Sequence, residues 1–416
     1  MKLEFGFGTG KQYVEVPDKN LRETVVQNEV KFDLTGEDEV KRALNNPIGA
    51  PRLRKVVKPG EKIVMITSDI TRPMPTYKVM PALLDELYAA GVSPKDLTLI
   101  FALGSHRRHT EAEMKKLAGE RAFSEIRCID SDTSECVHYG VTSRGTPVDI
   151  MKEVAEADGR ICLGNIEYHW FAGFSGGGKA IMPGVSTRAA IQSNHSKMTS
   201  PFAHAGCIDE NPIRMDIEEA ADMVGVDYIL NVVLDEHKQI VYAVAGDVKK
   251  AHRDGCKFLS GLYSKEIAER ADIVLVSQGG APKDLNLYQT QKALDNAKHA
   301  VKKGGTIILI GSCKEGLGEG VFEKWMTTAP SSHSMVERIQ TDFQLGGHKA
   351  AAIAMVLDDA DIYLVSEMDP KFVKSIFLTP FPTVQEAFDA AMKKQGENAT
   401  VIAMPFGGST LPHAKA

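Results

Sequence analysis

The sequence predicts an α/β protein built from two domains with mostly parallel sheets. Its 416 residues are too many for one ordinary hydrophobic core. Apolar runs of strand length alternate with amphipathic helical segments, and the alternation starts again after a charged, mainly helical stretch over residues 247–271. We therefore place a domain boundary near residue 265, which gives domains of residues 1–265 and 266–416. We expect the active site in the cleft between them.

The composition excludes several classes of protein. Apolar residues make up 43% of the chain and charged residues 25%, which is typical of a globular protein. The net charge of −6 argues against a general nucleic-acid or membrane-surface binder. No stretch approaches the roughly 20 apolar residues of a membrane helix, and the first residues do not resemble a signal peptide. The six cysteines form no C-x-x-C pair, so we expect reduced thiols and a cytoplasmic protein.

Three predicted strands of the N-terminal domain each lead into a polar loop. Residues 62–67 (KIVMIT) precede SDITRPMPT and a helix over residues 77–90. Residues 97–103 (LTLIFAL) precede GSHRRHT, and residues 160–164 (RICLG) precede NIEYHWFAGFSGGGKA. Ligands of open parallel sheets bind beyond the carboxyl ends of the strands. The side chains expected to share one crevice there are Asp69, Arg72, His106, His169 and Lys179.

The other predicted strands complete the two domains. A pair of strands at residues 228–234 and 239–245 closes the first domain. In the second, a strand, a helix and a strand form a βαβ unit, which a further strand, helix and strand extend, so we predict a Rossmann-like domain. These six segments are residues 272–277, 287–303, 306–311, 361–366, 384–394 and 400–405.

The segment GFSGGGK ends at Lys179 and has the spacing of a phosphate-binding loop. The next residue is Ala180, where a nucleotide hydrolase has the Ser or Thr that holds magnesium. Magnesium-dependent hydrolysis is therefore not expected, whereas binding of a phosphate-bearing group is. The spacing fits a glycine-rich turn with a solvated lysine equally well.

Three loop histidines, His106, His169 and His195, surround this segment in the chain. Histidine titrates near neutral pH, and its neutral ring binds nickel, copper or zinc. A single loop histidine is usually an ordinary surface residue, but three that converge with a lysine favour a functional site. Their spacing matches no standard zinc motif, which argues against a metal held by protein ligands alone. We interpret His109 and His204 as structural.

Other polar pairs have two interpretations each. Asp69 and Arg72 suit the orientation of a histidine and the binding of a carboxylate, but they also suit a local salt bridge. At the start of a predicted helix, Gln289 and Lys292 share one face after Tyr288. That face suits closure over a ligand, and ordinary exposed polarity explains it as well.

Several of these segments resemble the nickel-dependent lactate racemase family: SDITRPMPT, GSHR, IEYHWFAGFSGGGKAIMPG, NHSKM and LNLYQTQKA. The resemblance runs from about residue 10 to the C-terminus, and the block from His169 to His195 is its most specific part. It implies that Lys179 carries a nickel-pincer nucleotide (pyridinium-3-thioamide-5-thiocarboxylic acid mononucleotide) through a thioamide. It also implies that His195 is the fourth ligand of a planar Ni(II). The residues implied beside the phosphate are Gly176, Gly177 and Gly178.

The resemblance also implies a mechanism. A 2-hydroxy acid transfers the hydrogen at C2 to the pincer as hydride while a base removes the hydroxyl proton, and two bases are needed because two enantiomers are handled. His106 and His169 match these bases. Arg72 would bind the substrate carboxylate, and Asp69, counted among the residues at the cofactor, would support the nearby histidine. The substrate contacts implied in the second domain are Tyr288, Gln289 and Lys292.

One departure concerns the substrate. Lactate racemases of the family place a tryptophan over the substrate, and the corresponding stretch, GGHKAAA, contains none. A larger 2-hydroxy acid is therefore compatible, and Arg107 and Arg108 would be available for a second carboxylate, as in malate.

We thus predict a 2-hydroxy acid racemase or epimerase that meets its small-molecule substrate and, transiently, the enzymes that make its cofactor. Nucleic acids and membranes are not expected partners. One alternative is a non-catalytic phosphate- or nucleotide-binding protein that uses GFSGGGK, although it leaves three histidines without a role. Another is a zinc hydrolase, against which the histidine spacing counts.

Overall fold

A computed structural model describes residues 1–28, 30–104, 106–235 and 237–414. The chain divides into two compact units. The middle unit is Val30–Ser260, and the terminal unit combines Met1–Glu29 with Gly261–Ala416. The second change of unit lies near the predicted boundary at residue 265. The structure differs from the predicted division at the N-terminus, because the first 29 residues belong with the C-terminal part of the chain.

The middle unit contains a six-stranded sheet with the order β13-β12-β9-β4-β5-β6. All neighbouring strands are parallel except β12 and β13, which are antiparallel. The predicted strands of this domain are all present. Their bounds are Ile63–Ser68 (β4), Leu97–Ala102 (β5), Gly159–Ile166 (β9), Tyr228–Leu234 (β12) and Ile240–Gly246 (β13). The sixth strand of the sheet, β6 (Arg127–Asp130), was not predicted.

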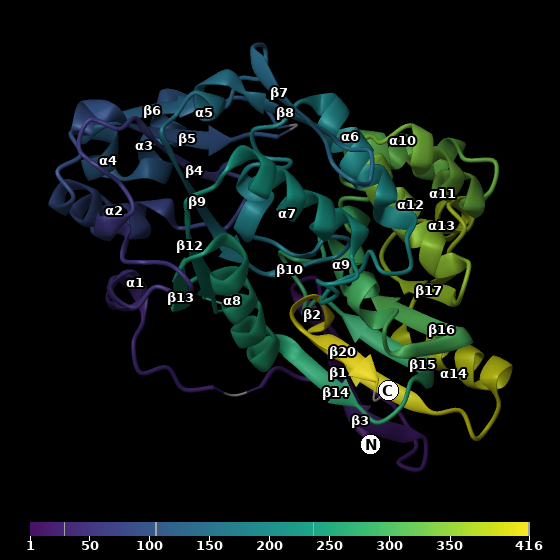
Figure 1. Ribbon diagram of the computed structural model, residues 1–416. Helices are drawn as coiled ribbons and strands as arrows, with labels where there is room; N and C mark the ends of the chain where they lie inside the picture. The colour runs from purple at the N-terminus through teal and green to yellow at the C-terminus, as the bar shows by residue number, and fades with distance from the viewer. Residues whose placement is uncertain (29, 105, 236, 415–416) are drawn as a thin grey trace. The chain divides into compact units, whose positions relative to one another are not determined.

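Helices cover both faces of this sheet (Figure 1). Four helices lie on one face, where Met65, Leu99 and Leu163 of alternate strand positions form a core with Leu83. They are α1 (Gly36–Asn45), α2 (Thr76–Ala89), α3 (Glu111–Ala118) and α4 (Glu120–Glu125). The helices α7 (Pro212–Val224) and α8 (Val248–Tyr263) lie on the other. A hairpin of β7 (Cys136–Val141) and β8 (Pro147–Met151) precedes α5 (Lys152–Ala155).

The terminal unit contains a second six-stranded sheet, with the order β18-β17-β16-β15-β19-β3 and parallel neighbours throughout. Its strands are β3 (Leu21–Thr24), β15 (Ala271–Ser277), β16 (Val301–Ile310), β17 (Asp361–Val365), β18 (Thr379–Phe381) and β19 (Val401–Met404). Its helices are α9 (Leu287–Ala297), α10 (Gly320–Thr328), α11 (Ser332–Thr341), α12 (Gly347–Leu357), α13 (Pro370–Ser375) and α14 (Val384–Gln395). A parallel pair, β14 (Ser264–Ile267) and β20 (Leu411–Ala414), lies beside them.

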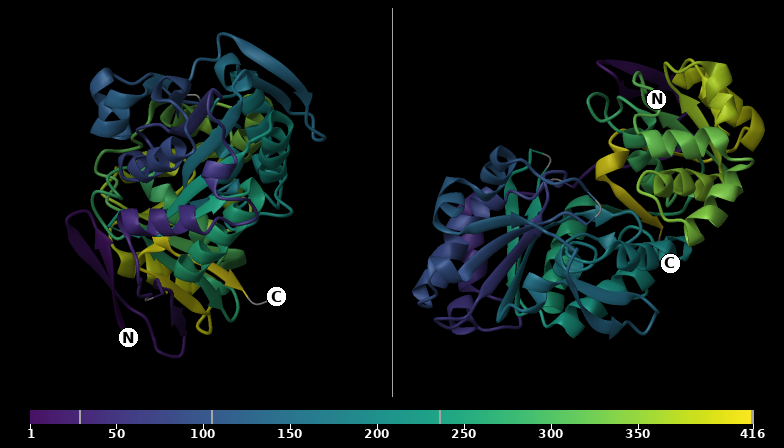
Figure 2. Two further views of the ribbon diagram at one scale, coloured as in Figure 1. Left: turned by 60° about the vertical axis from the view of Figure 1, so that its left-hand side comes forward. Right: turned by 90° about the horizontal axis from the view of Figure 1, so that it is seen from above.

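The start of the chain completes this sheet, which explains why it does not belong to the middle unit. Strand β3 pairs with β19, so Leu21 lies opposite Val401. The preceding hairpin of β1 (Lys2–Phe7) and β2 (Gly10–Glu15) places Phe5 and Val14 in the same core as strands β15 and β16. The purple N-terminal strands accordingly lie among green and yellow elements (Figures 1 and 2).

Two predicted helices are shorter than expected. The segment 247–271 is helical only to Tyr263 and then forms β14. The segment 287–303 is helical only to Ala297, and strand β16 begins at Val301. In the described part of the chain, none of the helices has the length and apolar character needed to cross a membrane.

Candidate active site

The three predicted loops follow adjacent strands. Strand β4 lies between β9 and β5, and all three are parallel, so their carboxyl ends meet at one edge of the sheet. Asp69 follows β4, His106 follows β5, and His169 follows β9. Since neighbouring strands are about 4.8 Å apart, the ends of β5 and β9 are separated by roughly 10 Å. The loop after β4 therefore lies between the loops that carry His106 and His169.

His106 is held by the loop after β4. Its Nδ1 lies 2.6 Å from Asp69 Oδ2, and Thr71 Oγ1 donates to the other oxygen, Asp69 Oδ1, at 2.8 Å. Burial favours a raised pKa for Asp69, but the hydrogen bond and charge of His106, with Thr71 and Arg72, outweigh it and the pKa is lowered. A carboxylate can only accept, so His106 Nδ1 carries the proton, and the neutral ring has its lone pair on Nε2.

His109 stabilises the loop that follows β4 through both of its ring nitrogens. Its Nδ1 donates to Asp130 Oδ1 at 2.6 Å, and its Nε2 accepts from the Ile70 N–H at 3.0 Å. Both ring nitrogens therefore have structural partners, which agrees with the structural interpretation of this histidine.

His169 lies in a tight hairpin between β10 (Tyr168–His169) and β11 (Gly173–Phe174). Its Nδ1 accepts from the Ala172 N–H at 3.3 Å. The backbone N–H can only donate, so in the neutral ring the proton is on Nε2. Burial lowers the pKa of His169 well below its ordinary value, and the positive charge of Lys179 and of Arg72 adds to this effect. His169 is therefore a neutral imidazole at pH 7.

Phe171, at the turn of this hairpin, is the common neighbour of the site residues. Its ring centroid lies 4.5 Å from that of His169 and 4.9 Å from that of His195, edge to face in both cases. Lys179 Nζ lies 5.9 Å from the centroid of the same ring. The structure thus gathers Lys179 and two of the three predicted histidines around one buried aromatic side chain. Phe171 is not among the residues predicted from the sequence, because it resembles any other apolar residue of the motif.

The glycine loop is closely packed against the protein. Gly176 and Gly177 have φ angles of 76° and 60°. A Cβ on Gly176 would lie 2.7 Å from Asn231 Oδ1, and one on Gly178 would lie 2.9 Å from Ala221 Cβ. The Gly177 N–H donates to Asn231 Oδ1 at 2.7 Å. Packing alone therefore requires these glycines, and the Gly177 N–H is already used within the protein. A phosphate contact by this loop stays a prediction.

Lys179 follows within the short helix η3 (Gly177–Ala180), which packs on β9, β4 and α7. Burial lowers the pKa of Lys179 well below its ordinary value, and Arg214 and Arg72 lower it further, while Glu167 acts in the opposite direction. A solvated surface lysine is therefore not what the structure contains. The excess of positive charge around this amine suits an anionic ligand.

His195 ends helix α6 (Arg188–His195) and is 8% exposed. Its Nδ1 lies 3.0 Å from Asn194 Oδ1, and Asn194 Nδ2 donates to the Ile213 carbonyl at 3.2 Å. The second bond orients the amide so that its oxygen faces the ring. His195 Nδ1 then carries the proton and Nε2 carries the lone pair, which suits a metal ligand.

The described residues contain no group of three or more His, Cys, Asp or Glu side chains arranged to hold a metal ion. A protein-only ligand set, as a zinc hydrolase needs, is therefore absent from this part of the chain.

Two more buried residues of the site were missed. Arg214, on α7, donates to the backbone of the segment 172–176, and His252, on α8, bonds the Ser175 carbonyl through Nε2 at 2.7 Å. Both lie far along the chain from the motif, and nothing in their local sequence distinguishes them from other polar residues of amphipathic helices.

The predicted substrate residues of the terminal unit begin helix α9. The carbonyl of Tyr288 accepts from Lys349 Nζ at 2.6 Å, and that of Gln289 accepts from Gln278 Nε2 at 2.9 Å. The side chain of Lys292 is exposed. The GGHKAAA stretch begins α12, and a Cβ on its Gly347 would lie 2.5 Å from the buried Trp325 ring.

The suggested role of Arg107 and Arg108 finds no support. Arg107 pairs with Glu113 at 2.7 Å and Arg108 pairs with Asp132 at 2.5 Å. Both guanidinium groups are thus already engaged by carboxylates on the surface, where their side chains are 65% and 69% exposed.

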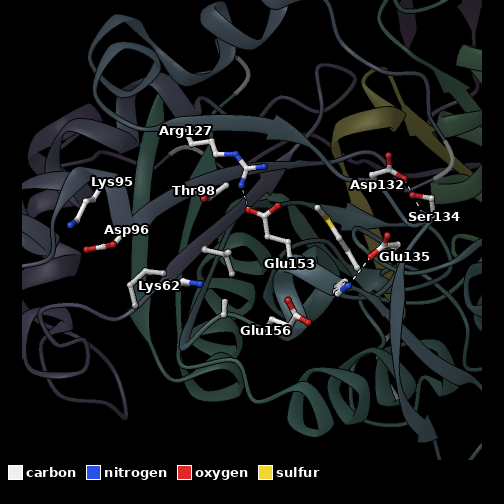
Figure 3. A pocket seen from close by; sticks show the side chains of 15 residues that line it. Lys62, Lys95, Asp96, Thr98, Arg127, Asp132, Ser134, Glu135, Glu153 and Glu156 are labelled. Carbon is white, nitrogen blue, oxygen red and sulfur yellow. Dashed lines mark hydrogen bonds and ion pairs between the residues drawn. The ribbon is translucent and has the colours of Figure 1, made fainter.

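A cavity of about 630 Å³ lies away from these residues (Figure 3). Its lining includes Lys62 and Asp96, which precede β4 and β5, so it opens near the amino ends of these strands rather than at the edge that holds His106. Charged side chains of the lining pair with one another, as Arg127 does with Glu153. None of the predicted site residues lines this cavity. We therefore do not assign it to the chemistry.

Both parts of the chain match domains of known proteins. The profile of the lactate racemase N-terminal domain matches residues 7–206, and that of the lactate racemase C-terminal domain matches residues 267–411. The chain is 34% identical to a lactate racemase of Thermoanaerobacterium thermosaccharolyticum, with 99% of both chains covered. It is 32% identical to a lactate racemase of Lactiplantibacillus plantarum, with 94% of this chain and 95% of the relative covered.

Solved structures give the same result. The lactate racemase apoprotein of Thermoanaerobacterium thermosaccharolyticum has a TM-score of 0.87 at 32% identity, with 99% of this chain and 100% of that chain covered. A protein of Thermotoga maritima has a TM-score of 0.63 at 17% identity, with 93% and 100% covered, and shares the fold.

Fold, site and relatives together define an enzyme of the isomerase class, a racemase. The matches to both domains and over nearly the whole chain show more: the chain belongs to the lactate racemase family.

Proposed function

We propose that this racemase inverts the configuration at C2 of a 2-hydroxy acid, with His106 and His169 as its acid–base residues and Lys179 as the attachment point of a nickel-pincer nucleotide. The relatives are named lactate racemases, and lactate is a 2-hydroxy acid. The observation that carries the proposal is the gathering of His169, His195 and Lys179 around Phe171. His106 lies on the loop that follows β5, two strands away from β9.

The residues present fit the proposed cofactor. A nucleotide is anionic, and Lys179 lies in the field of Arg72 and Arg214. His195 has its Nε2 lone pair for one metal bond, because Asn194 holds the proton on Nδ1. When bound, the nickel-pincer nucleotide supplies the acceptor for the C2 hydrogen of the substrate.

The two histidine rings carry a proton on different nitrogens. His106 accepts a hydroxyl proton at Nε2, and Asp69 stabilises the resulting positive charge through Nδ1–H. His169 carries its proton on Nε2 in the neutral ring, because Nδ1 accepts from the Ala172 N–H, so Nε2–H can donate a hydrogen bond to the substrate. One histidine takes the hydroxyl proton of one enantiomer, and the other, once protonated to imidazolium, donates the proton that forms the hydroxyl of the opposite enantiomer. Arg72 is proposed to bind the substrate carboxylate through paired hydrogen bonds.

Further parts of the proposal concern substrate, partners and location. We propose that Tyr288, Gln289 and Lys292 contact the substrate, and that the enzymes that make the cofactor bind transiently. We also propose that the protein is cytoplasmic, because its six cysteines are all free thiols, as expected in a reducing compartment.

The first test follows optical rotation for a panel of enantiopure 2-hydroxy acids, with protein produced together with the cofactor-making enzymes. Mass spectrometry and nickel analysis of the same protein should show an adduct on Lys179 and one bound nickel. Unmodified Lys179 under these conditions would favour a non-catalytic phosphate-binding protein.

Histidine variants test the assigned roles. His106→Ala and His169→Ala should each lower the racemisation rate by about 10²–10⁴-fold with nickel retained, whereas His195→Ala should lose nickel. His138→Ala is the control, because this exposed histidine pairs with Asp149 on the β7–β8 hairpin. Wild-type turnover by either base variant would contradict the two-base assignment.

A further inference from the structure

Arg214 is a fully buried cation whose hydrogen bonds go to the backbone of the catalytic loop. Its Nε donates to the Ala172 carbonyl at 3.3 Å and one terminal nitrogen donates to the Gly176 carbonyl at 3.3 Å. The other terminal nitrogen donates to the Phe174 carbonyl. The guanidinium therefore spans the segment that joins the His169 hairpin to the glycine loop.

Among the described residues, no carboxylate forms an ion pair with Arg214. The three carbonyl groups that it contacts are neutral dipoles. Glu218, one turn further along α7, instead forms an ion pair with Arg253 at 2.6 Å, and Arg253 also pairs with Asp209 at 2.9 Å. Burial lowers the pKa of Arg214, opposed by the charge of Glu218, to about 10, so that it stays charged at pH 7. Its field therefore acts on neighbouring groups at low dielectric.

Charged and titratable side chains from several packed elements face the Lys179 amine. Burial disfavours its ammonium form most, Arg214 from α7 and Arg72 from the loop after β4 disfavour it further, and Glu167 after β9 favours it. The charge of Lys179 also disfavours protonation of two imidazoles, those of His169 on β10 and His252 on α8. Burial lowers the pKa of both rings well below the ordinary value, so they are neutral at pH 7 and add no charge.

We propose that Arg214 is a positioning residue that fixes the segment 172–176 and, through its charge, keeps the Lys179 amine unprotonated, and hence nucleophilic, before any cofactor is attached. An ammonium group has no lone pair, so only the neutral amine can form a covalent bond to an acyl or thioacyl carbon. The Gly176 carbonyl that accepts from Arg214 also accepts from the Lys179 N–H at 3.3 Å, so the guanidinium lies one carbonyl group away from the backbone of the lysine. A charged guanidinium held there by neutral carbonyls adds to burial in disfavouring the ammonium form.

The test measures acetylation of Lys179 by acetic anhydride as a function of pH in the full-length protein produced without cofactor. In this reaction the amine nitrogen bonds to the acyl carbon, acetate leaves with the electron pair of the broken C–O bond, and the proton passes to water. Mass spectrometry of peptides quantifies the labelling at Lys179. N-acetyl-lysine amide in the same tube gives the profile of an ordinary amine, with a midpoint near pH ~10.4.

The wild-type midpoint should lie well below that of the reference amine. In Arg214→Gln the midpoint should rise by about one pH unit or more, which lowers the labelling rate at pH 7 by about tenfold or more. Arg214→Lys retains the charge and should keep most of the low midpoint. Arg160→Gln is the matched control, since Arg160 also bonds two carbonyls, those of Val154 and Ala155, but at the amino end of β9.

Two results would overturn the inference: a wild-type midpoint equal to that of the reference amine, or a folded Arg214→Gln protein with the wild-type midpoint. If Arg214→Gln does not fold, Glu167→Gln decides, because removing the one opposing charge should lower the midpoint further, and an unchanged or raised midpoint counts against the proposal. The inference builds on the proposed role of Lys179, but the two fail separately. A low midpoint in a protein that never acquires an adduct would support the effect of Arg214 on the Lys179 amine and would refute the attachment of the cofactor to Lys179.

Discussion

Replacing Asp69 with Asn changes one atom of the site and should disable His106. Thr71 Oγ1 donates to Asp69 Oδ1 at 2.8 Å, so the amide oxygen of the new side chain keeps that position and its NH2 group takes the place of Oδ2. In the native site Oδ2 lies 2.6 Å from His106 Nδ1. An NH2 group cannot accept, so Nδ1 must give up its proton to Nε2, the atom that should receive the proton of the substrate.

The expected loss in rate is that of a histidine base whose proton lies on the wrong ring nitrogen, here Nε2 of His106. General base catalysis contributes about 10²–10⁴-fold, and a wrong histidine tautomer in the serine protease triad costs about 10⁴-fold in kcat. We expect kcat to fall by about 10³-fold, equivalent to roughly 4 kcal/mol in activation free energy, with little change in KM because Arg72 is intact. Racemisation is followed by chiral chromatography, and ¹⁵N NMR of the imidazole reports which nitrogen carries the proton.

Two further proteins make this test decisive. Thr71→Val in the Asp69→Asn background lets the amide turn its oxygen towards Nδ1 and should recover part of the rate. Asp149→Asn is the control, since Asp149 also lies 2.6 Å from a histidine Nδ1, that of the exposed His138. A kcat within about threefold of wild type for Asp69→Asn, or a large loss with the proton still on Nδ1, would refute the tautomer argument.

Two other predictions concern the glycine loop and its support. Gly177→Ala should lower the free energy of unfolding by at least about 1–2 kcal/mol, because its φ of 60° is left-handed and the new Cβ would lie 3.0 Å from His252 Cγ. Gly261→Ala, with open space around its Cβ, should change little in the same urea titration. His252, 1% exposed, has a pKa lowered first by burial and then by Arg214, so the unfolded chain binds a proton that the folded chain rejects. Stability should therefore fall as pH drops below about 6.5, by up to about 1.4 kcal/mol per pH unit, and His252→Asn should remove that part of the slope; an unchanged slope would show that the ring is protonated in the fold.

The sequence by itself determined the elements that carry the site. Short apolar runs rich in β-branched residues, such as KIVMIT and LTLIFAL, favour buried strands, and a polar loop directly after each run places Asp69 and His106 at carboxyl ends. These are local patterns, so their prediction depended on neighbouring residues alone. The family resemblance likewise depended on short contiguous motifs, and the full-length relatives confirm it.

Only the tertiary structure decided which of these loops are neighbours and what surrounds each side chain. The order β9-β4-β5 brings together segments that are far apart in the chain, and hydrogen bonds between such strands leave no signal in either strand alone. The same holds for β3, which joins the opposite end of the chain. Phe171 and Arg214 are ordinary residue types whose importance comes from their position. Phe171 lies against His169, His195 and Lys179. Arg214 is a buried cation whose hydrogen bonds go to backbone carbonyls of the segment 172–176. Protonation states in this site are set by hydrogen-bonding and charged groups from helices and loops that are distant in the chain. Only the folded structure shows which of these groups are neighbours.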